Sequence, residues 1–339
     1  MNALQKLNSM RQAGGTRRTV GLADSVIERF LKTDPLLGQA IDEGFAAYEK
    51  AKAEFPELIN LDENDQLHTI QAGYVNFYND DAVNPYVALA ARGPWVVTLK
   101  GAVVQDSGGY GMLGAGHAPQ AIIDAMARPQ VMANIMTPSL SHLRLDRALR
   151  AEIGHTRGGC PYSRFLCLNS GSESVTLAGR LADVHTKDMT DPGAPHAGRK
   201  VRRIAVKGAF HGRTELPALY SDSSRKAYAD NLASFAHHQH TIIIDPYSVE
   251  QLREAFAKAE AEGWHIEAVF LEPVMGEGNP GRGLTPEFYA AARELTKAHG
   301  TLLLVDSIQA GLRAHGVLSV VDYPGFEGLE APDIETYSK

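Results

Sequence analysis

The sequence predicts an α/β fold built on a mostly parallel β-sheet that is covered by helices. The first observation behind this prediction is that short apolar segments alternate with helical patterns between residues 165 and 305. Strands and helices that alternate in this way form parallel sheets with helices on both faces. The second observation is that four of the apolar segments run into glycine or chemically functional side chains. Because ligands gather at the carboxyl ends of parallel strands, these endings predict one binding site.

The bulk composition is that of an ordinary enzyme-sized protein. The 339 residues are 44% apolar and 22% charged, and this length suits one large domain with a smaller one, or two similar domains. The formal net charge of −7 does not suggest a nucleic-acid surface. No apolar run approaches the roughly 18 residues that span a membrane, and the first residues lack the apolar stretch of a secretory signal. We therefore expect a cytoplasmic protein without nucleic-acid or membrane partners.

The two cysteines are also consistent with the cytoplasm. Cys160 and Cys167 are too few for a disulfide framework, and they lie in a strand-like region. We expect both to be reduced thiols in or near the core.

The first 90 residues are expected to form a helical extension. Residues 1–22 carry four basic residues and no acid, as organellar transit peptides do, but we expect a disordered start instead. From residue 23 to about residue 59, apolar residues recur at helical spacing, with breaks at Pro35 and Pro56.

A β-hairpin is predicted next, over residues 95–106, with its turn at Lys100-Gly101. Pro119 then opens a helix. After that the chain alternates strand and helix, and its best-marked helix is capped by Thr285 and ended by Gly300. The expected strands are residues 165–168, 201–206, 241–244, 268–271 and 302–305, and the other expected helices run from Ser172 to about Lys187 and over 249–261.

A phosphate site is predicted at Ser170-Gly171-Ser172-Glu173, between an expected strand and an expected helix. The N–H groups and the dipole of a helix start favour a phosphate, and Gly171 lets the backbone approach it closely. An ordinary helix start with Ser172 as its N-cap is the alternative.

A site for a cationic ring is predicted at Asp306, which ends an apolar strand where a carboxylate is unfavourable unless it is paired. A pyridinium nitrogen suits this position, because the carboxylate keeps it protonated and the charged ring can delocalise a carbanion. An aspartate that caps the following turn is the alternative. Gln309 could reach a ring hydroxyl, and Phe210 suits stacking on the ring, although it could also be a core residue beside a solvated His211.

Residues from about 91 to 339 resemble the class III aminotransferases, the ornithine, acetylornithine and 4-aminobutyrate group of fold-type-I pyridoxal-phosphate enzymes. Six blocks occur in the order of the family, and the set is specific although each block alone is weak. The blocks are residues 91–106 with Gly116-His117, Asn169-Ser170-Gly171-Ser172-Glu173, Phe210-His211-Gly212-Arg213-Thr214, Glu272-Pro273-Val274-Met275-Gly276-Glu277-Gly278, Asp306-Ser307-Ile308-Gln309, and Pro332-Asp333-Ile334 followed by Lys339.

The resemblance implies the domain organisation and the role of each site residue. Residues 1–90 would be an N-terminal extension, 91–125 the N-terminal part of a smaller α+β domain, and 126–339 the large pyridoxal-phosphate-binding domain. Lys339 would form the Schiff base with pyridoxal 5'-phosphate and shuttle the proton. The cofactor would also be bound by Gly171 and Ser172 at its phosphate, by Phe210 and His211 beside its ring, by Asp306 at the ring nitrogen, by Gln309 at the ring oxygen and by Glu272 in support.

The resemblance also implies the reaction. An amino group would move from a terminal amine, such as that of ornithine, lysine, acetylornithine or 4-aminobutyrate, to a 2-oxo acid such as 2-oxoglutarate. Glu277, which in the ornithine-type branch pairs with a substrate-binding arginine, and Tyr110 would line the substrate pocket. The protein would be a homodimer without a metal site. Decarboxylation, epimerisation, amino-group migration and a non-catalytic relative are the alternatives.

Four departures from the family pattern weaken any transfer of substrate identity. They are Ser307 for a glutamate, Met275 for a glutamine, Ala314-His315-Gly316 for an arginine-threonine-glycine run, and Ala118-Pro119 for histidine-proline. The C-terminal part of the small domain does not occur in this chain, so we expect a longer parent chain that supplies an arginine for the substrate carboxylate.

Two other motifs suggest different functions. Residues 109–114 have the spacing of a dinucleotide-binding glycine motif, but no acid ends a strand around residues 130–136, as that fingerprint requires. The run His237-His238-Gln239-His240 has the spacing of no common metal site, and a surface loop is the favoured interpretation.

Overall fold

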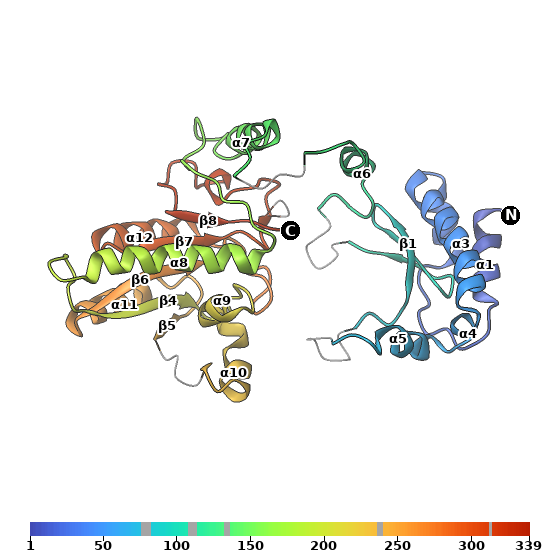
Figure 1. Ribbon diagram of the computed structural model, residues 1–339, viewed down its shortest axis with the longest axis horizontal. Helices are drawn as coiled ribbons and strands as arrows, with labels where there is room; N and C mark the ends of the chain where they lie inside the picture. Colours follow the sequence, from blue (N-terminus) through green and yellow to red (C-terminus); the bar gives the residue numbers. More distant parts are fainter. Residues whose placement is uncertain (76–82, 108–113, 132–135, 236–239, 312–313) are drawn as a thin grey trace. The chain divides into compact units, whose positions relative to one another are not determined.

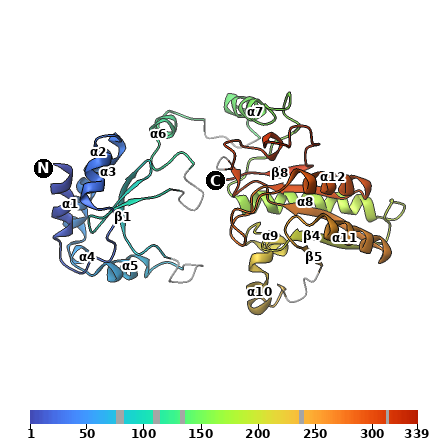
Figure 2. The same cartoon turned by 180° about the vertical axis from the view of Figure 1, so that it is seen from behind.

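The computed structural model describes residues 1–75, 83–107, 114–131, 136–235, 240–311 and 314–339. The chain forms two compact units, Met1–Met132 and Ala133–Lys339 (Figures 1 and 2), and each is described by itself. Among the helices of these ranges, none has the length and apolarity needed to cross a membrane. The expected domain bounds at residues 90 and 125 stay a prediction.

The N-terminal unit packs helices against a small antiparallel sheet. The sheet has the order β1-β2-β3, and the predicted hairpin is confirmed by the register that pairs Trp95 with Gln105 and Val97 with Val103. Both Trp95 and Val97 are buried in one core with residues of α1, α2 and α3. The elements are α1 (Ala3–Arg11), α2 (Asp24–Leu31), α3 (Pro35–Glu54), α4 (Pro56–Ile59), α5 (Glu63–Gln71), β1 (Ala88–Arg92), β2 (Trp95–Thr98), β3 (Val103–Gln105) and α6 (Gln120–Met126).

The expectation of a disordered start is wrong, because residues 3–11 form α1. Asn2 and Gln5 cap this helix reciprocally, each side chain accepting a hydrogen bond from the other's backbone N–H. Leu7 and Met10 are fully buried in the core of the unit. The Nε of Arg11 also donates to the carbonyl of Gly101, at 2.9 Å, so the hairpin turn and the helix hold each other. Two apolar side chains three positions apart outweigh the basic composition of this segment.

The C-terminal unit is built on a five-stranded sheet of order β5-β4-β6-β7-β8, in which every neighbouring pair is parallel. The predicted α/β class is therefore confirmed. The strands are β4 (Lys200–Val206), β5 (Thr241–Ile244), β6 (Trp264–Leu271), β7 (Leu302–Asp306) and β8 (Ile334–Thr336). The helical elements are α7 (Leu140–Glu152), α8 (Gly171–Thr190), α9 (Glu215–Tyr220), α10 (Asp222–Asn231), α11 (Val249–Ala261), α12 (Pro286–Ala298) and the 3-10 turn η5 (Val320–Asp322).

Helices cover both faces of this sheet (Figure 1). Successive side chains of a strand point to opposite faces. On one face Phe270 and Leu304 pack against Val175 of α8. On the other face Val269 and Leu303 share a core with Phe256 of α11 and Phe288 of α12. The central strands β6 and β7 are thus buried on both sides, as their apolar runs predict.

One predicted strand is wrong and one strand was missed. Residues 165–168 pair with no strand among the described residues, and the side chains of Leu166 and Leu168 are exposed. Cys167 is exposed as well, not in or near the core, whereas Cys160 is half-buried. The missed strand is β8, which pairs with β7 on the side opposite β6 and has Glu335 as its central residue. A short apolar run forms a strand only where a partner strand lies beside it.

Candidate active site

Four strands of the parallel sheet end at one edge, and the segments that follow them carry the predicted site residues. β4 leads to Phe210 and His211, β6 to Glu272, β7 ends on Asp306, and β8 leads to Lys339. The register of β7 with β8 sets Asp306 directly beside Thr336, and the backbone N–H of Ser307 donates to the carbonyl of Thr336 at 2.9 Å.

Asp306 and His211 form a buried pair at this edge. The Nδ1 of His211 lies 2.8 Å from Oδ2 of Asp306, and the two side chains are 0% and 6% exposed. Burial of His211 favours its neutral form, but the hydrogen bond to Asp306 and the negative charges of Asp306 and Glu272 together outweigh it and raise the pKa of the imidazole above its ordinary value. The other carboxylate oxygen, Oδ1, accepts from the N–H of Ile308 at 3.0 Å and from the hydroxyl of Thr336 at 3.3 Å. The pair therefore holds a carboxylate in a fixed orientation.

Glu272 ties two of the converging segments together. Its Oε1 accepts from the N–H of Phe210 at 2.9 Å and its Oε2 accepts from the N–H of Gly276 at 3.0 Å. Burial raises the pKa of this carboxyl group to about 7, although the nearby His211 opposes the shift. Glu272 thus supports the site through the backbone.

The start of α8 forms the turn at which a phosphate was predicted. Ser170, not Ser172, is the N-cap, and its hydroxyl accepts from the N–H of Glu173 at 3.2 Å. The Oε2 of Glu173 accepts from the N–H of Asn169 at 2.8 Å. Because the first N–H groups of a helix have no acceptor within it, this turn offers donors to an anion.

Close backbone approaches show that the separate blocks meet. A Cβ atom on Gly171 would lie 2.8 Å from the side chain of Ile308, and one on Gly212 would lie 2.6 Å from the hydroxyl of Ser172. Similarly, a Cβ on Gly276 would lie 2.1 Å from Oε1 of Gln309. The absence of side chains at these glycines lets the phosphate turn, the strand ends and the glutamine come together.

Buried nitrogen atoms of His211 and Gln309 at this edge have no hydrogen-bond partner within the described ranges. They are the Nε2 atoms of the two side chains. Buried polar groups in proteins are almost always satisfied, so unsatisfied ones point to a missing ligand or water. Both atoms lie in blocks that were predicted to contact the cofactor.

Phe210 and Glu277 are joined by an arginine. The guanidinium of Arg213 lies 5.3 Å from the centre of the Phe210 ring, and its Nη2 lies 3.0 Å from Oε1 of Glu277. Phe210 is half-buried, which is consistent with one ring face against the protein. The predicted aromatic platform and the predicted substrate acid therefore belong to one cluster.

Lys339 follows β8 by three residues. It is exposed and has a φ of 47°, and its carbonyl lies 3.8 Å from the position of a Cβ on Gly311. Tyr110, the other predicted substrate residue, lies outside the described residues, as do His237, His238 and Gln239 of the histidine run.

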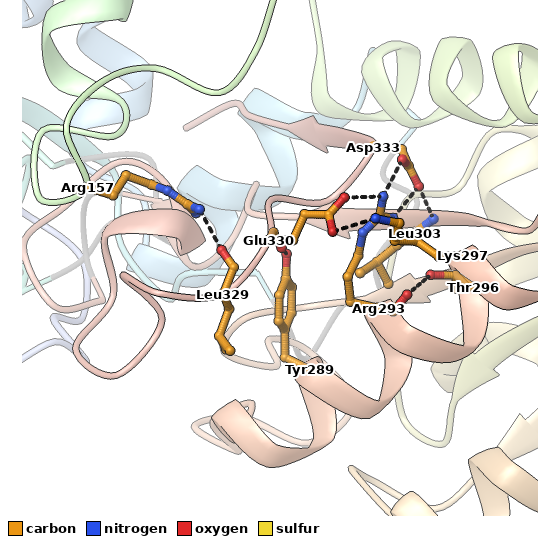
Figure 3. Close-up of polar contacts among 9 residues, drawn as sticks. All are labelled: Arg157, Tyr289, Arg293, Thr296, Lys297, Leu303, Leu329, Glu330 and Asp333. Carbon is orange, nitrogen blue, oxygen red and sulfur yellow. Dashed lines mark hydrogen bonds and ion pairs between the residues drawn. The ribbon is translucent and has the colours of Figure 1, made fainter.

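The segment that leads into β8 is held by a clamp on α12 (Figure 3). Arg293 donates to both carboxylate oxygens of Asp333, at 2.7 and 3.0 Å, and to Glu330 at 3.2 Å. Lys297 donates to Glu330 at 2.8 Å, and Asp333 also accepts from the N–H of Leu303 in β7 at 2.8 Å. The clamp fixes the start of the strand that leads to Lys339.

Sequence reasoning missed two further residues of this edge. Thr336 bonds to Asp306, and Glu335 accepts hydrogen bonds from several segments. Both residues lie on β8, the outermost strand beside β7, whose polar sequence gives no local signal that could have pointed to them.

Comparison with known proteins identifies relatives of this arrangement. The family model described as aminotransferase class-III matches residues 77–339. An ornithine aminotransferase from Toxoplasma gondii is 23% identical, with a TM-score of 0.63 over 81% of this chain and 59% of that chain. An N-acetylornithine aminotransferase from Stenotrophomonas maltophilia is 22% identical, with a TM-score of 0.55 over 80% of this chain and 60% of that chain.

A transaminase from the marine bacterium Virgibacillus is 19% identical, with a TM-score of 0.60 over 80% of this chain and 60% of that chain. At these identities the solved structures establish the fold, which is that of the fold-type-I pyridoxal-phosphate enzymes. The chain spans about three fifths of the length of each of these three proteins.

Proposed function

This chain belongs to the class III aminotransferases, and from that premise we propose that it moves an amino group with pyridoxal 5'-phosphate as cofactor. The donor would be a terminal amine, such as that of ornithine, lysine, acetylornithine or 4-aminobutyrate, and the acceptor a 2-oxo acid such as 2-oxoglutarate. The observation that carries the proposal is the buried pair of Asp306 and His211 beside the strand that leads to Lys339.

The residues at the sheet edge fit pyridoxal phosphate. The N–H groups at Gly171 and Ser172 suit its phosphate, and the half-buried ring of Phe210 suits its flat face. Asp306 would pair with the ring nitrogen, and the unsatisfied Nε2 of Gln309 would donate to the ring oxygen. When bound, the cofactor withdraws electrons from the amine-bearing carbon of the substrate, which makes its proton acidic.

The side chains of this chain would then do three things. Lys339 would hold the aldehyde of the cofactor covalently and would move the proton at its Nζ. Asp306, fixed by His211, would keep the ring nitrogen protonated. Glu277, paired with Arg213 at 3.0 Å, and Tyr110 would select the substrate. We also propose a homodimer in the cytoplasm, as is typical of the family.

Reconstitution of the purified protein tests the proposal. We expect wild-type protein with pyridoxal phosphate to be yellow, and the Lys339→Ala variant to lose the pH-dependent visible absorbance and the turnover of amines. Half-reactions with the four amines, followed by absorbance, would identify the donor. Release of CO2 or racemised substrate would identify the other reaction types. Wild-type protein that is colourless after saturation with the cofactor and removal of the unbound part would overturn the proposal.

A further inference from the structure

Glu335, in the middle of β8, accepts four hydrogen bonds. Its Oε1 accepts from the hydroxyl of Ser307 at 2.5 Å and from the N–H of Val320 at 2.9 Å. Its Oε2 accepts from the hydroxyls of Tyr162 at 2.5 Å and Ser319 at 2.6 Å. A carboxylate has about four acceptor positions, so this one is fully used within the protein. Burial, and after it the proximity of the Glu335 charge, raises the pKa of Tyr162.

These four donors come from separate parts of the C-terminal unit. Tyr162 lies after α7, Ser307 directly follows Asp306 at the end of β7, and Ser319 and Val320 lie at the start of η5. Ser307 and Ser319 are 1% and 0% exposed, so without the carboxylate their hydroxyls would lose the acceptor to which they donate. The hydrogen bond from Ser307 to Glu335 therefore links β8 to the residue next to Asp306.

The position of β8 depends on its pairing with β7, on the packing of Ile334 in the core beside α8, and on hydrogen bonds on both sides of the strand. The strand has three residues, and among the described residues it pairs with β7 alone. The clamp on α12 fixes the chain before β8, at Glu330 and Asp333 (Figure 3). Glu335 is the corresponding anchor on the side that leads to Lys339, four residues on. A two-sided anchor is what a short strand requires if the residue that follows it is to be held in place.

We propose that Glu335 is a positioning residue for Lys339: by accepting from Ser307, its carboxylate fixes the exit of β8 relative to Asp306. The inference rests on the proposed function, because it gives Lys339 a task that depends on its place. It also gives a partner to Ser307, which stands where the resembled family has a glutamate. Here a carboxylate meets the end of β7 from the neighbouring strand instead.

Three variants separate positioning from charge and from folding. Glu335→Gln keeps the shape but turns one oxygen into an NH2 group, so two of the four donors lose their acceptor. Ser307→Ala keeps the charge of Glu335 and removes one bond. Glu260→Gln is the matched control, since it neutralises a half-exposed carboxylate of α11 that pairs with Arg199 and lies outside the clamp. Melting temperature and circular dichroism of each variant check the fold.

Two measurements report on the amine of Lys339. In the protein without cofactor, competitive acetylation with mass spectrometry gives the midpoint at which its amine becomes reactive. In the protein with pyridoxal phosphate, the visible spectrum gives the midpoint of the pH transition. We expect Glu335→Gln and Ser307→Ala each to move both midpoints by about half a pH unit or more, and Glu260→Gln to move neither.

The outcomes distinguish this inference from the proposed function. A shift in Glu335→Gln but not in Ser307→Ala would mean that the charge alone acts on Lys339, and would overturn positioning. Variants that melt earlier but keep both midpoints would show a purely structural role, which also overturns it. If wild-type protein binds no cofactor, the proposed function fails, and the acetylation midpoints still decide whether Glu335 positions Lys339.

Discussion

The proposed chemistry depends most on Asp306, and His211 is its hydrogen-bond partner at this buried position. A carboxylate that is 6% exposed at the end of a buried strand has lost most of its hydration. The imidazole of His211 replaces that hydration with a charge-assisted hydrogen bond. Burial lowers the pKa of His211, but the contacts with its acidic neighbours raise it further than burial lowers it. The pair thus holds the Asp306 carboxylate in place, where it is available to a cationic ring nitrogen.

We predict that His211→Phe lowers both stability and cofactor affinity. The variant leaves Oδ2 of Asp306 without its donor, and removing one partner of a buried pair destabilises by about 3 kcal/mol. Since the pKa of His211 is raised on folding, its contribution is fully present below the ordinary histidine pKa and is lost as the pH rises through the folded value. The deficit of the variant should therefore shrink toward alkaline pH, as measured by urea denaturation.

His211→Asn is the matched control, because its side-chain amide retains an N–H donor near the position of Nδ1. We expect it to recover part of the stability and of the cofactor affinity, measured by fluorescence titration with pyridoxal phosphate. Equal loss in both variants at every pH would contradict the assigned role of the hydrogen bond.

At the scale of single elements, α1 shows how burial overrides composition. Leu7 and Met10 are fully buried beside Trp95 and Val97, so the helix is part of the N-terminal core. We predict that Leu7→Ala lowers the free energy of unfolding by about 3 kcal/mol through lost burial and a residual cavity. Calorimetry and limited proteolysis of the N-terminal unit would measure the effect.

Val20→Ala provides the comparison for that prediction, because Val20 is 72% exposed. We expect it to change stability by no more than about 0.5 kcal/mol. If Leu7→Ala were as mild as Val20→Ala, the start of the chain would contribute nothing to the core, and the disordered start expected from composition would be correct after all.

The elements that sequence reasoning predicted well are those whose signals are local. α12 carries its own cap, since Thr285 accepts from the N–H of Phe288 at 3.2 Å, and β7 is apolar throughout. β8 gives no such signal, because the polar centre of the strand is stabilised by donors from distant segments. Residues 165–168 show the opposite case. Their apolar composition predicts a buried strand, but burial depends on a partner strand, which the local sequence does not supply.

At the scale of the whole molecule, the candidate site gathers residues from 170 to 339 at one edge of one sheet. Motif order and strand endings predicted which residues meet there, because parallel strands necessarily end together. The bonds among them could not be predicted. That His211 faces Asp306, that Glu272 binds two backbone N–H groups and that Arg213 joins Glu277 to Phe210 all depend on loop conformations. The sequence specifies these only through the complete fold.

The C-terminal unit also carries a histidine cluster that should make its stability fall in acid. His265 is 2% exposed and stacks on His196 with ring centres 4.9 Å apart, and burial with the neighbouring His196, His185 and Arg199 lowers the pKa of His265 to about 4. Because the unfolded chain binds this proton more readily, the contribution of His265 is present near neutral pH and is lost as the pH falls from its ordinary pKa toward 4. Glu272, with its raised pKa of about 7, acts in the opposite direction, so the wild-type profile alone would not isolate the histidine.

We predict that His265→Phe, which keeps a ring but cannot be protonated, gains about 2 kcal/mol relative to wild type between neutral pH and pH 4. Urea denaturation across this range measures the difference, with His68→Phe, at an exposed histidine of α5, as the control. If the free energy of unfolding of wild type and of His265→Phe changed in parallel with pH, His265 would take up its proton in the folded protein. The histidine cluster would then not disfavour the charged form.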